Sequence, residues 1–479
     1  MTVRKKVFVA LVFIVALLLG LGILSGLIFP PDLPETHADM RLHFKYGSIG
    51  AEGRAGIPYW IWRVLPDLFP GYLPDRPGAG YARFGFIYEP DSPRSRPIGT
   101  SYREKQIPLV GLNCAVCHVG TVRESPEAAP QIILGMPAHQ FRLQEYIRFL
   151  YACAKDERFQ AGSILSAIRS VNPDFSWWNR LIYRFLVIPR TKDALLKQGQ
   201  DFSWFDRRPP QGPGRVDTFN PYKTIFGFDM EADDTIATAD LPSLWNQKIR
   251  EGMWLHWDGN NNKVEERNKS AAIGAGATEK SLDLAGMKRV EDWIWELQPP
   301  KFPGDRIDRS RIERGEKVYE QHCRECHDAG AKMVGRVTAI EKIGTDPKRL
   351  NSFTAALAEK MNTIGTGYSW KFSHFRKTDG YASMPLDGLW LRAPYLHNGS
   401  VPTLRDLLNP PLERPKVFYR GYDVYDSGKV GFVSSGPEAE RLGFKYDTSA
   451  AGNGNGGHTY GTGLNPKEKE DLLEYLKTL

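Results

Sequence analysis

The chain has 479 residues, enough for two or three domains of ordinary size with a sizeable core. A composition of 41% hydrophobic and 25% charged residues excludes a wholly disordered protein. The formal net charge is +7, but basic and acidic residues are interleaved, whereas a nucleic-acid-binding protein concentrates its basic residues. We therefore expect no nucleic-acid partner.

An apolar segment follows three basic residues at the N-terminus. Arg4, Lys5 and Lys6 precede an apolar run over residues 7–29. As a helix this run would span about 34 Å, enough to cross a hydrocarbon core of about 30 Å. It is longer than a typical secretory signal, so residues 1–29 predict a single transmembrane anchor with the remaining chain on the periplasmic side of the inner membrane. The alternative is a cleaved signal and an exported, soluble protein.

Helical periodicity marks several later stretches, and strand signals are sparse. The predicted helices are Gln140–Lys155, Ala161–Ser170, Leu282–Leu297, Arg311–Cys323 and Lys467–Leu476. A proline cluster within residues 298–304 predicts a domain boundary. We therefore predict a mainly α-helical fold, with an N-terminal domain at 30–300, including a Pro/Gly-rich extension, and a C-terminal domain at 301–479.

Two Cys-x-x-Cys-His motifs carry the clearest chemistry. They comprise Cys114, Cys117 and His118, and Cys323, Cys326 and His327. Two thiols three positions apart can add to the two vinyl groups of one haem, and the histidine that follows binds the iron. No further cysteine pair lies close enough to complete a zinc site. The sequence therefore predicts two covalently bound haem c groups, one in each domain.

The chain resembles the bacterial di-haem cytochrome c peroxidase superfamily, which includes the methylamine-utilisation di-haem enzymes and the rubber oxygenases. The segments that carry the resemblance are residues 112–120 and 393–404, and those most similar to the rubber-oxygenase-like branch are residues 214–217, 241–245, 257–259 and 474–479. The resemblance covers about residues 100–479. It implies two cytochrome c-like domains that face each other, with a reactive first haem.

Two histidines are candidates for the second haem. His458 follows a flexible glycine-rich run at 452–457 and precedes the terminal helix. By position it matches the loop that supplies the distal ligand of the second haem in the superfamily. His397 lies in a segment that recurs there, so we expect it to order the second haem pocket by hydrogen bonding, and it is the runner-up ligand. The predicted iron ligands are His118, His327 and His458.

The distal side of the first haem remains open. His139, 21 positions after His118, and His256 are both candidates for an iron ligand or a distal acid–base group. Trp245 matches the superfamily's aromatic residue near or between the haems, and an ordinary core tryptophan is the alternative. Glu265 and Glu266 could donate protons, although charged surface is the simpler interpretation.

The resulting hypothesis is a membrane-anchored di-haem c-type cytochrome that acts as an oxidoreductase. Peroxide would be reduced at the first haem, and the second haem would relay electrons. We expect a small oxidant such as hydrogen peroxide or dioxygen, and a redox protein or quinol-linked electron donor. A pure electron carrier and a rubber-oxygenase-like dioxygenase are the alternatives. Relatives can hold calcium between the haems, but no carboxylate cluster in this sequence supports such a site.

Overall fold

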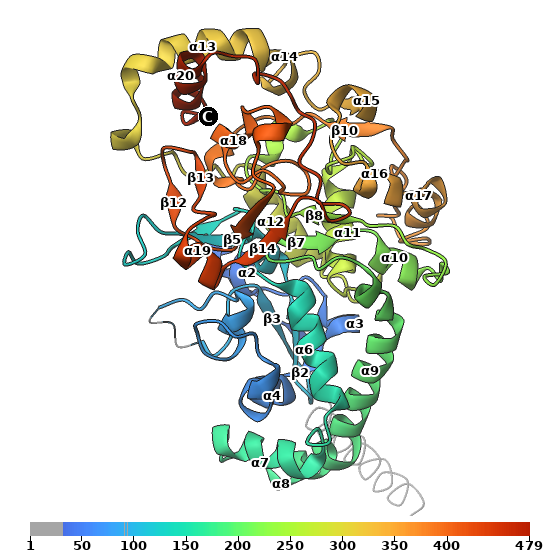
Figure 1. Cartoon of the computed structure of the whole chain (residues 1–479). Helices are drawn as coiled ribbons and strands as arrows, with labels where there is room; N and C mark the ends of the chain where they lie inside the picture. The colour runs from blue at the N-terminus through green and yellow to red at the C-terminus, as the bar shows by residue number, and fades with distance from the viewer. Residues whose placement is uncertain (1–31, 91, 93) are drawn as a thin grey trace, which may run out of the picture.

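The computed structural model describes residues 32–90, 92 and 94–479 (Figure 1). About 41% of the chain is helical and 12% is strand, so the fold is a mixture of helices and strands. The expectation of a mainly α-helical fold is therefore wrong. The strands are only two to five residues long, too short to leave an alternating pattern that sequence analysis could detect.

The expected membrane anchor is also corrected. Within the part of the chain that the structure describes, no helix is long and apolar enough to cross a membrane. This finding overturns the single-pass anchor and the membrane-anchored location inferred from it. Residues 1–29, to which the anchor was assigned, lie outside the described residues.

The helices divide into a larger N-terminal group and a smaller C-terminal group. The first is α2 (Met40–Tyr46), α3 (Glu52–Ala55), α4 (Tyr59–Leu68), α5 (Cys114–His118), α6 (Leu143–Lys155), α7 (Ala161–Val171), α8 (Trp177–Ile182), α9 (Ile188–Asp201), α10 (Asn220–Ile225), α11 (Val264–Gly274) and α12 (Leu284–Trp295). The second is α13 (Arg309–His322), α14 (Arg324–His327), α15 (Ile340–Ile343), α16 (Lys348–Ser352), α17 (Ala355–Met361), α18 (Leu404–Leu407), α19 (Pro437–Leu442) and α20 (Pro466–Leu476). The five helices predicted from periodicity correspond to α6, α7, α12, α13 and α20 and are confirmed.

The strands form one four-stranded sheet and several two-stranded ladders. The sheet has the antiparallel order β1 (Leu33–Pro34), β3 (Thr100–Glu104), β4 (Leu109–Leu112), β2 (Ile57–Pro58). The ladders pair β5 (Val119–Val122) with β6 (Gln131–Leu134), β7 (Arg215–Asp217) with β8 (Thr238–Asp240), β9 (Val337–Ala339) with β10 (Gly380–Ala382), β11 (Val417–Arg420) with β14 (Phe444–Asp447), and β12 (Tyr425–Asp426) with β13 (Gly431–Phe432).

The two halves of the chain share a hydrophobic core. One buried cluster joins Val122, Met136 and Trp245 to residues of α13, α20 and the 389–432 region. Asp423 in addition accepts hydrogen bonds from Thr121 and Arg123. The domain boundary near residue 300 stays a prediction, but the halves on either side of it are packed together.

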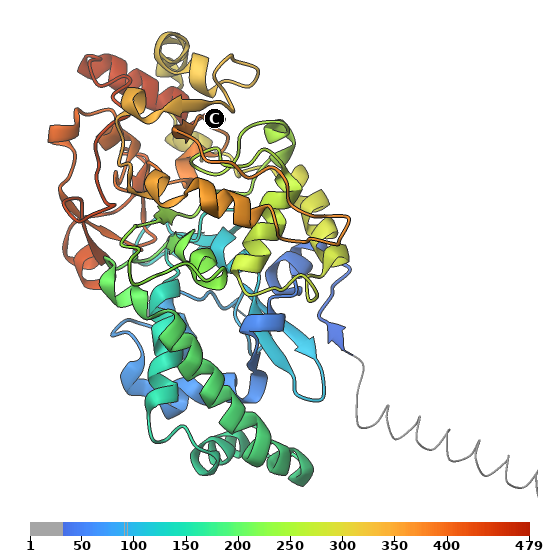
Figure 2. The same ribbon diagram turned by 90° about the vertical axis from the view of Figure 1, so that its right-hand side faces the viewer.

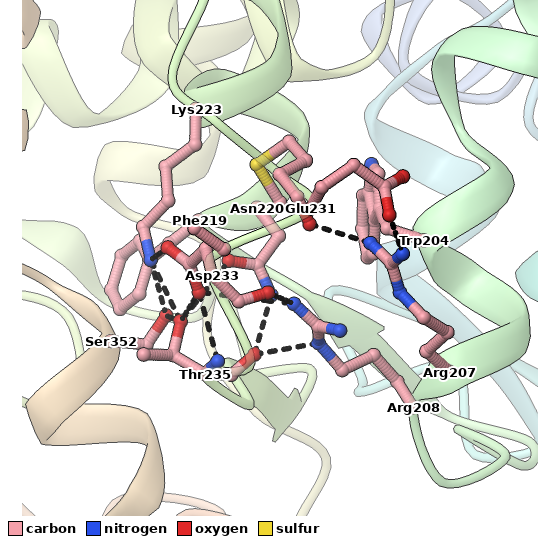
Figure 3. Close-up of polar contacts among 12 residues, drawn as sticks. Trp204, Arg207, Arg208, Phe219, Asn220, Lys223, Glu231, Asp233, Thr235 and Ser352 are labelled. Carbon is pink, nitrogen blue, oxygen red and sulfur yellow. Dashed lines mark hydrogen bonds and ion pairs between the residues drawn. The ribbon is translucent and has the colours of Figure 1, made fainter.

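A polar network with a buried lysine fixes the connection between β7 and β8 (Figure 3). Lys223 on α10 donates to Asp233 and Thr235, each at 2.7 Å, and to Ser352 on α16 at 3.3 Å. Because Ser352 belongs to the C-terminal half, the network ties the connection that precedes β8 to that half.

Helices α6 and α9 form an arm that projects from the body. They run side by side and carry α7 and α8 at their far end, away from α13 and α20 (Figures 1 and 2).

Candidate haem-binding site

The first motif forms α5, a single helical segment capped by Asn113, whose side chain accepts from the amide of Ala115 at 3.0 Å. His118 Nδ1 lies 2.9 Å from the carbonyl oxygen of Pro242, two residues after β8. A proton on Nδ1 satisfies this contact and leaves Nε2 for a metal. Burial lowers the pKa of His118 to about 4, so the ring is neutral at pH 7, as a ligand must be.

The second motif repeats this arrangement. Cys326 and His327 lie on α14, directly after α13. His327 Nδ1 lies 2.8 Å from the carbonyl oxygen of Met384, again two residues after a strand, β10. Burial lowers the pKa of His327 as well. Both motif histidines are therefore oriented by a backbone carbonyl, with Nε2 left free.

The ring of His458 faces that of His327 at a distance that fits an iron between them. The ring centres lie 6.2 Å apart. Imidazole nitrogens bind transition metals at about 2.0–2.1 Å, and each nitrogen lies about 1.1 Å from its ring centre, so two imidazoles on one metal have centres about 6 Å apart. The residues present thus fit a six-coordinate haem. The ring of His458 lies opposite that of His327, and the role of His458 as an iron ligand stays a prediction.

The loop that carries His458 is tightly held, contrary to the flexibility expected from its glycines. Buried Arg414 donates to the carbonyls of Asn455, Gly457 and His458 at 2.6, 2.8 and 3.2 Å. Asn398 donates to the carbonyls of Gly452 and Gly454. His458 itself has φ +44°, a conformation uncommon for a residue other than glycine. These contacts fix the direction of the His458 ring.

His397 lies beside this loop but does not face His327. Its ring stacks on Tyr381 at 4.3 Å, and burial lowers its pKa well below the usual value. Its neighbour Asn398, rather than His397, makes the contacts to the glycine-rich loop. A second-iron ligand role for His397 is therefore less favoured by the geometry than one for His458.

Both halves contain the same turn, a repeat that sequence analysis missed. Antiparallel bridges close residues Leu255–Asn261 and Tyr395–Val401, each over six positions. A helix begins three residues later in both cases, α11 at Val264 and α18 at Leu404. In this register Trp257 corresponds to His397 and Asp258 to Asn398. Both turns contain a Leu-His pair followed by a glycine, in Leu-His-Trp-Asp-Gly and Leu-His-Asn-Gly. The Leu-His pair lies one position later in the second turn than in the first, so aligning the two pairs does not align the turns.

Each turn is hydrogen-bonded to a strand of the other half of the chain. The two strands, β8 and β10, are those that precede the carbonyls in contact with His118 and His327. The amide of Asp240, at the end of β8, donates to the carbonyl of His397 at 2.9 Å. The amide of Ala382, at the end of β10, donates to the carbonyl of Trp257 at 2.8 Å. The indole of Trp257 also donates to the carbonyl of Asp240 at 2.9 Å. Trp257 therefore bridges the segments that orient His118 and His327.

Trp245 packs at the same junction. Its indole is 1% exposed and donates to the carbonyl of Leu134 at 2.8 Å. Gly135 and Gly388 contact it from the two halves of the chain, and a Cβ at either position would lie 2.6 or 2.8 Å from the indole. These surroundings fit both alternatives given for Trp245, an aromatic residue between the haems and an ordinary core tryptophan.

His256 has one free ring nitrogen and a fixed tautomer. Its Nδ1 lies 2.5 Å from Asn260 Oδ1, and Asn260 Nδ2 donates in turn to buried Asp258. The amide orientation requires a proton on Nδ1, so Nε2 carries the lone pair. Burial lowers the pKa of His256 to about 4.

Arg267 on α11 is a candidate that the sequence analysis did not select. Burial is the main cause of the lowered pKa of His118 and His256, and the positive charge of Arg267 adds to it in both cases. Burial lowers the pKa of Arg267 itself to about 10. Its position three residues after the helix start gave no signal in the sequence.

The other distal candidates are occupied with structural contacts. His139 is buried, donates from Nε2 to the carbonyl of Thr121 at 2.9 Å and stacks on Phe432 at 3.9 Å. Glu266 is buried rather than on the surface, and its carboxylate accepts from Asn261 and contacts His374. Glu265 is paired with Lys269. These contacts favour structural roles for all three.

The four motif cysteines are not arranged as a thiolate metal site. Burial raises the pKa of Cys114 to about 11 and that of Cys117 to about 12, so both free thiols are protonated at pH 7. In the ranges that the structure covers, no group of three or more His, Cys, Asp or Glu side chains could hold a metal ion. Thioether attachment of haem remains the chemistry that fits these thiols.

Comparison with known proteins places one segment of the chain. A family model described as RoxA-like, cytochrome c-like matches residues 380–419. This segment contains Met384, Asn398 and Arg414, which orient His327 and the His458 loop. The match supports binding of haem c and a role in haem-based redox chemistry or electron transfer.

Two relatives are similar over longer stretches. The chain is 26% identical to the uncharacterized protein y4iJ of Sinorhizobium fredii over 89% of this chain and 86% of the relative. It is 30% identical to the uncharacterized protein y4iM of the same organism over 50% of this chain and 64% of the relative. The matched segment at 380–419, and not these two relatives, points to the rubber-oxygenase and di-haem cytochrome branch.

Proposed function

We propose that this protein is a di-haem c-type oxidoreductase that reduces a small peroxide at a first haem, held by Cys114, Cys117 and His118. The second haem, held by Cys323, Cys326 and His327, would deliver the electrons. The observation that carries the proposal is an asymmetry. His327 faces a second imidazole, His458, whereas no aromatic ring of the described chain faces His118 in this way.

An open iron site and a closed one suit different tasks. Two fixed imidazoles keep an iron six-coordinate, which suits electron transfer because little has to rearrange. A site with one protein ligand can accept a small oxidant. A bound haem would supply one-electron redox chemistry at its iron.

We assign the distal acid–base role in peroxide reduction to His256 and the charge-stabilising role to Arg267. Reduction of hydrogen peroxide to two waters consumes two electrons and two protons. Neutral His256 can accept the proton of an approaching peroxide at Nε2 and return it to the departing oxygen. The guanidinium of Arg267 would stabilise the negative charge that develops as the O–O bond breaks.

The junction between the halves supports electron relay. Trp257 is hydrogen-bonded to Asp240 and Ala382, each two residues from the carbonyl that orients a motif histidine. This arrangement offers a short path through bonded groups from His327 to His118. The electron donor would be a redox protein or a quinol-linked carrier.

A dioxygenase is the second candidate function. The RoxA-like match favours it, because an open first haem can bind dioxygen as well as peroxide. Fold similarity does not transfer substrate, so the two must be separated by assay.

The test is electron paramagnetic resonance of the oxidised full chain, together with a haem count. We expect two covalent haems, one low-spin from the His327/His458 pair and one high-spin at His118. His458→Ala should make the second haem high-spin, while His256→Ala should keep both spin states and slow turnover with hydrogen peroxide at least tenfold.

Three results would count against the proposal or its ligand assignment. Two low-spin signals would favour an electron carrier. Consumption of dioxygen with an unsaturated hydrocarbon but no turnover of peroxide would favour the dioxygenase. An unchanged low-spin spectrum in His458→Ala would move the ligand role to another residue, with His397 tested next.

A further inference from the structure

The tip of the projecting arm exposes an unusual set of large apolar side chains. Trp177, Trp178 and Phe185 are 68%, 55% and 72% exposed. Leu181 and Leu186 are exposed beside them. They lie on α8 and on the π-helical turn Tyr183–Val187 that continues it toward α9. Contiguous exposed aromatic residues at the end of a projection mark an interaction surface rather than a core.

The same tip is strongly basic. Residues 161–192 contain five basic side chains and one acidic one, Asp174. Arg169, Arg184 and Arg190 are exposed. None of the three forms an ion pair with another residue that the structure describes. The surface therefore combines an apolar patch with uncompensated positive charge.

A groove between α7 and α8 brings three of these arginines together. It encloses about 270 Å³ and is lined by Ala161, Leu165, Arg169, Arg180, Leu181 and Arg184. The Nε of Arg180 donates to the carbonyl of Phe175 at 2.9 Å, which orients this guanidinium. Planar guanidinium groups are the preferred partners of phosphate oxygens.

We propose that this arm tip docks on the surface of an anionic phospholipid membrane. Trp177, Trp178 and Phe185 would enter the interfacial region, and the arginine-lined groove would hold a lipid phosphate. Tryptophan is enriched at membrane interfaces, and basic residues beside an apolar face are attracted to anionic lipids. The contact is peripheral and requires no spanning helix.

Charge complementarity selects the membrane over a second copy of the chain. A symmetric contact between two tips would bring like-charged arginines together, which disfavours such an interface. The patch lies at the far end of the arm (Figure 2), and its aromatic side chains are exposed there, as insertion into an interface requires.

The experiment places a nitroxide on the full chain at Phe185→Cys, with Leu412→Cys, 92% exposed on a different part of the surface, as the matched control. With vesicles of phosphatidylcholine containing phosphatidylglycerol, the label at 185 should become accessible to oxygen and protected from a water-soluble nickel chelate. The label at 412 should not change. Because the label reports only its own surroundings, residues outside the arm cannot produce the signal.

A second variant tests the groove. Arg169→Glu with Arg184→Glu should raise the vesicle concentration needed for half of the change roughly 30-fold, at about fivefold for each basic residue lost from an anionic surface. Lys317→Glu, an exposed charge change on α13, should have little effect. Continued exposure of label 185 to the chelate would overturn the proposal, as would equal binding to pure phosphatidylcholine. A change that depends on protein concentration without vesicles would indicate a second copy and would also overturn it.

Discussion

At the scale of single residues, Arg414 determines where His458 points. Besides the three carbonyls of the glycine-rich loop, its guanidinium donates to the carbonyls of Leu407 and Asn409. All five N–H groups therefore end on backbone oxygens. No carboxylate contributes to this arrangement among the described contacts of Arg414, so its role is to hold the backbone in place.

Replacing Arg414 should release the glycine-rich loop that carries His458. In Arg414→Ala several buried carbonyls lose their partner, which should lower the free energy of unfolding by about 3 kcal/mol. The low-spin signal of the second haem should decrease at least twofold. Arg414→Lys, with three donors, should restore part of it. Arg405→Ala, which removes a more exposed arginine paired with Glu470, is the control, and electron paramagnetic resonance with denaturant titration is the measurement.

At the scale of elements, the second haem motif is supported by the crossing of α13 and α20. Gly315 on α13 faces the backbone of Asp471 on α20, and a Cβ at Gly315 would overlap with the carbonyl of Asp471. Arg314 adds an ion pair to the Asp471 carboxylate at 2.8 Å. The glycine is needed so that the two helices can approach closely enough to bury Tyr319.

A methyl group at this crossing should force the helices apart. Gly315→Ala should cost about 1–3 kcal/mol by overpacking, despite the higher helix propensity of alanine. Lys317→Ala, on the exposed side of the same helix, should leave the unfolding midpoint nearly unchanged. Urea titration followed by circular dichroism measures both variants. Equal stability of Gly315→Ala and the parent would show that the crossing can relax.

At the scale of the whole molecule, buried neutral histidines should make the fold sensitive to acid. Burial lowers the pKa of His139 from 6.5 to about 4. Between these pH values His139 is protonated in the unfolded chain but stays neutral in the folded chain. The free energy of unfolding therefore decreases as the pH falls from about 6.5 to 4. For His139 the loss is about 3 kcal/mol.

His139→Gln should remove this contribution. The variant should show a shallower decrease in the free energy of unfolding between pH 6.5 and 4, by about 3 kcal/mol. His322→Gln, at an exposed position, controls for the loss of a histidine. Denaturant titrations at several pH values test the expectation, and a slope equal to that of the parent would contradict it.

The sequence by itself determined the haem motifs and five of the helices. A Cys-x-x-Cys-His pentapeptide is local chemistry, and an amphipathic helix is a local pattern, so both can be recognised without knowing what they pack against. The position of His458 before the terminal helix also followed from the sequence, through resemblance to a known superfamily.

Only the tertiary structure decided the rest. The carbonyls of Pro242 and Met384 that orient His118 and His327 lie 124 and 57 positions away along the chain. The pairings of β1 with β3 and of β9 with β10 likewise depend on contacts between distant segments. Backbone carbonyls and long-range charges have no residue-type signature, and this is the physical reason why composition and periodicity could not reveal them.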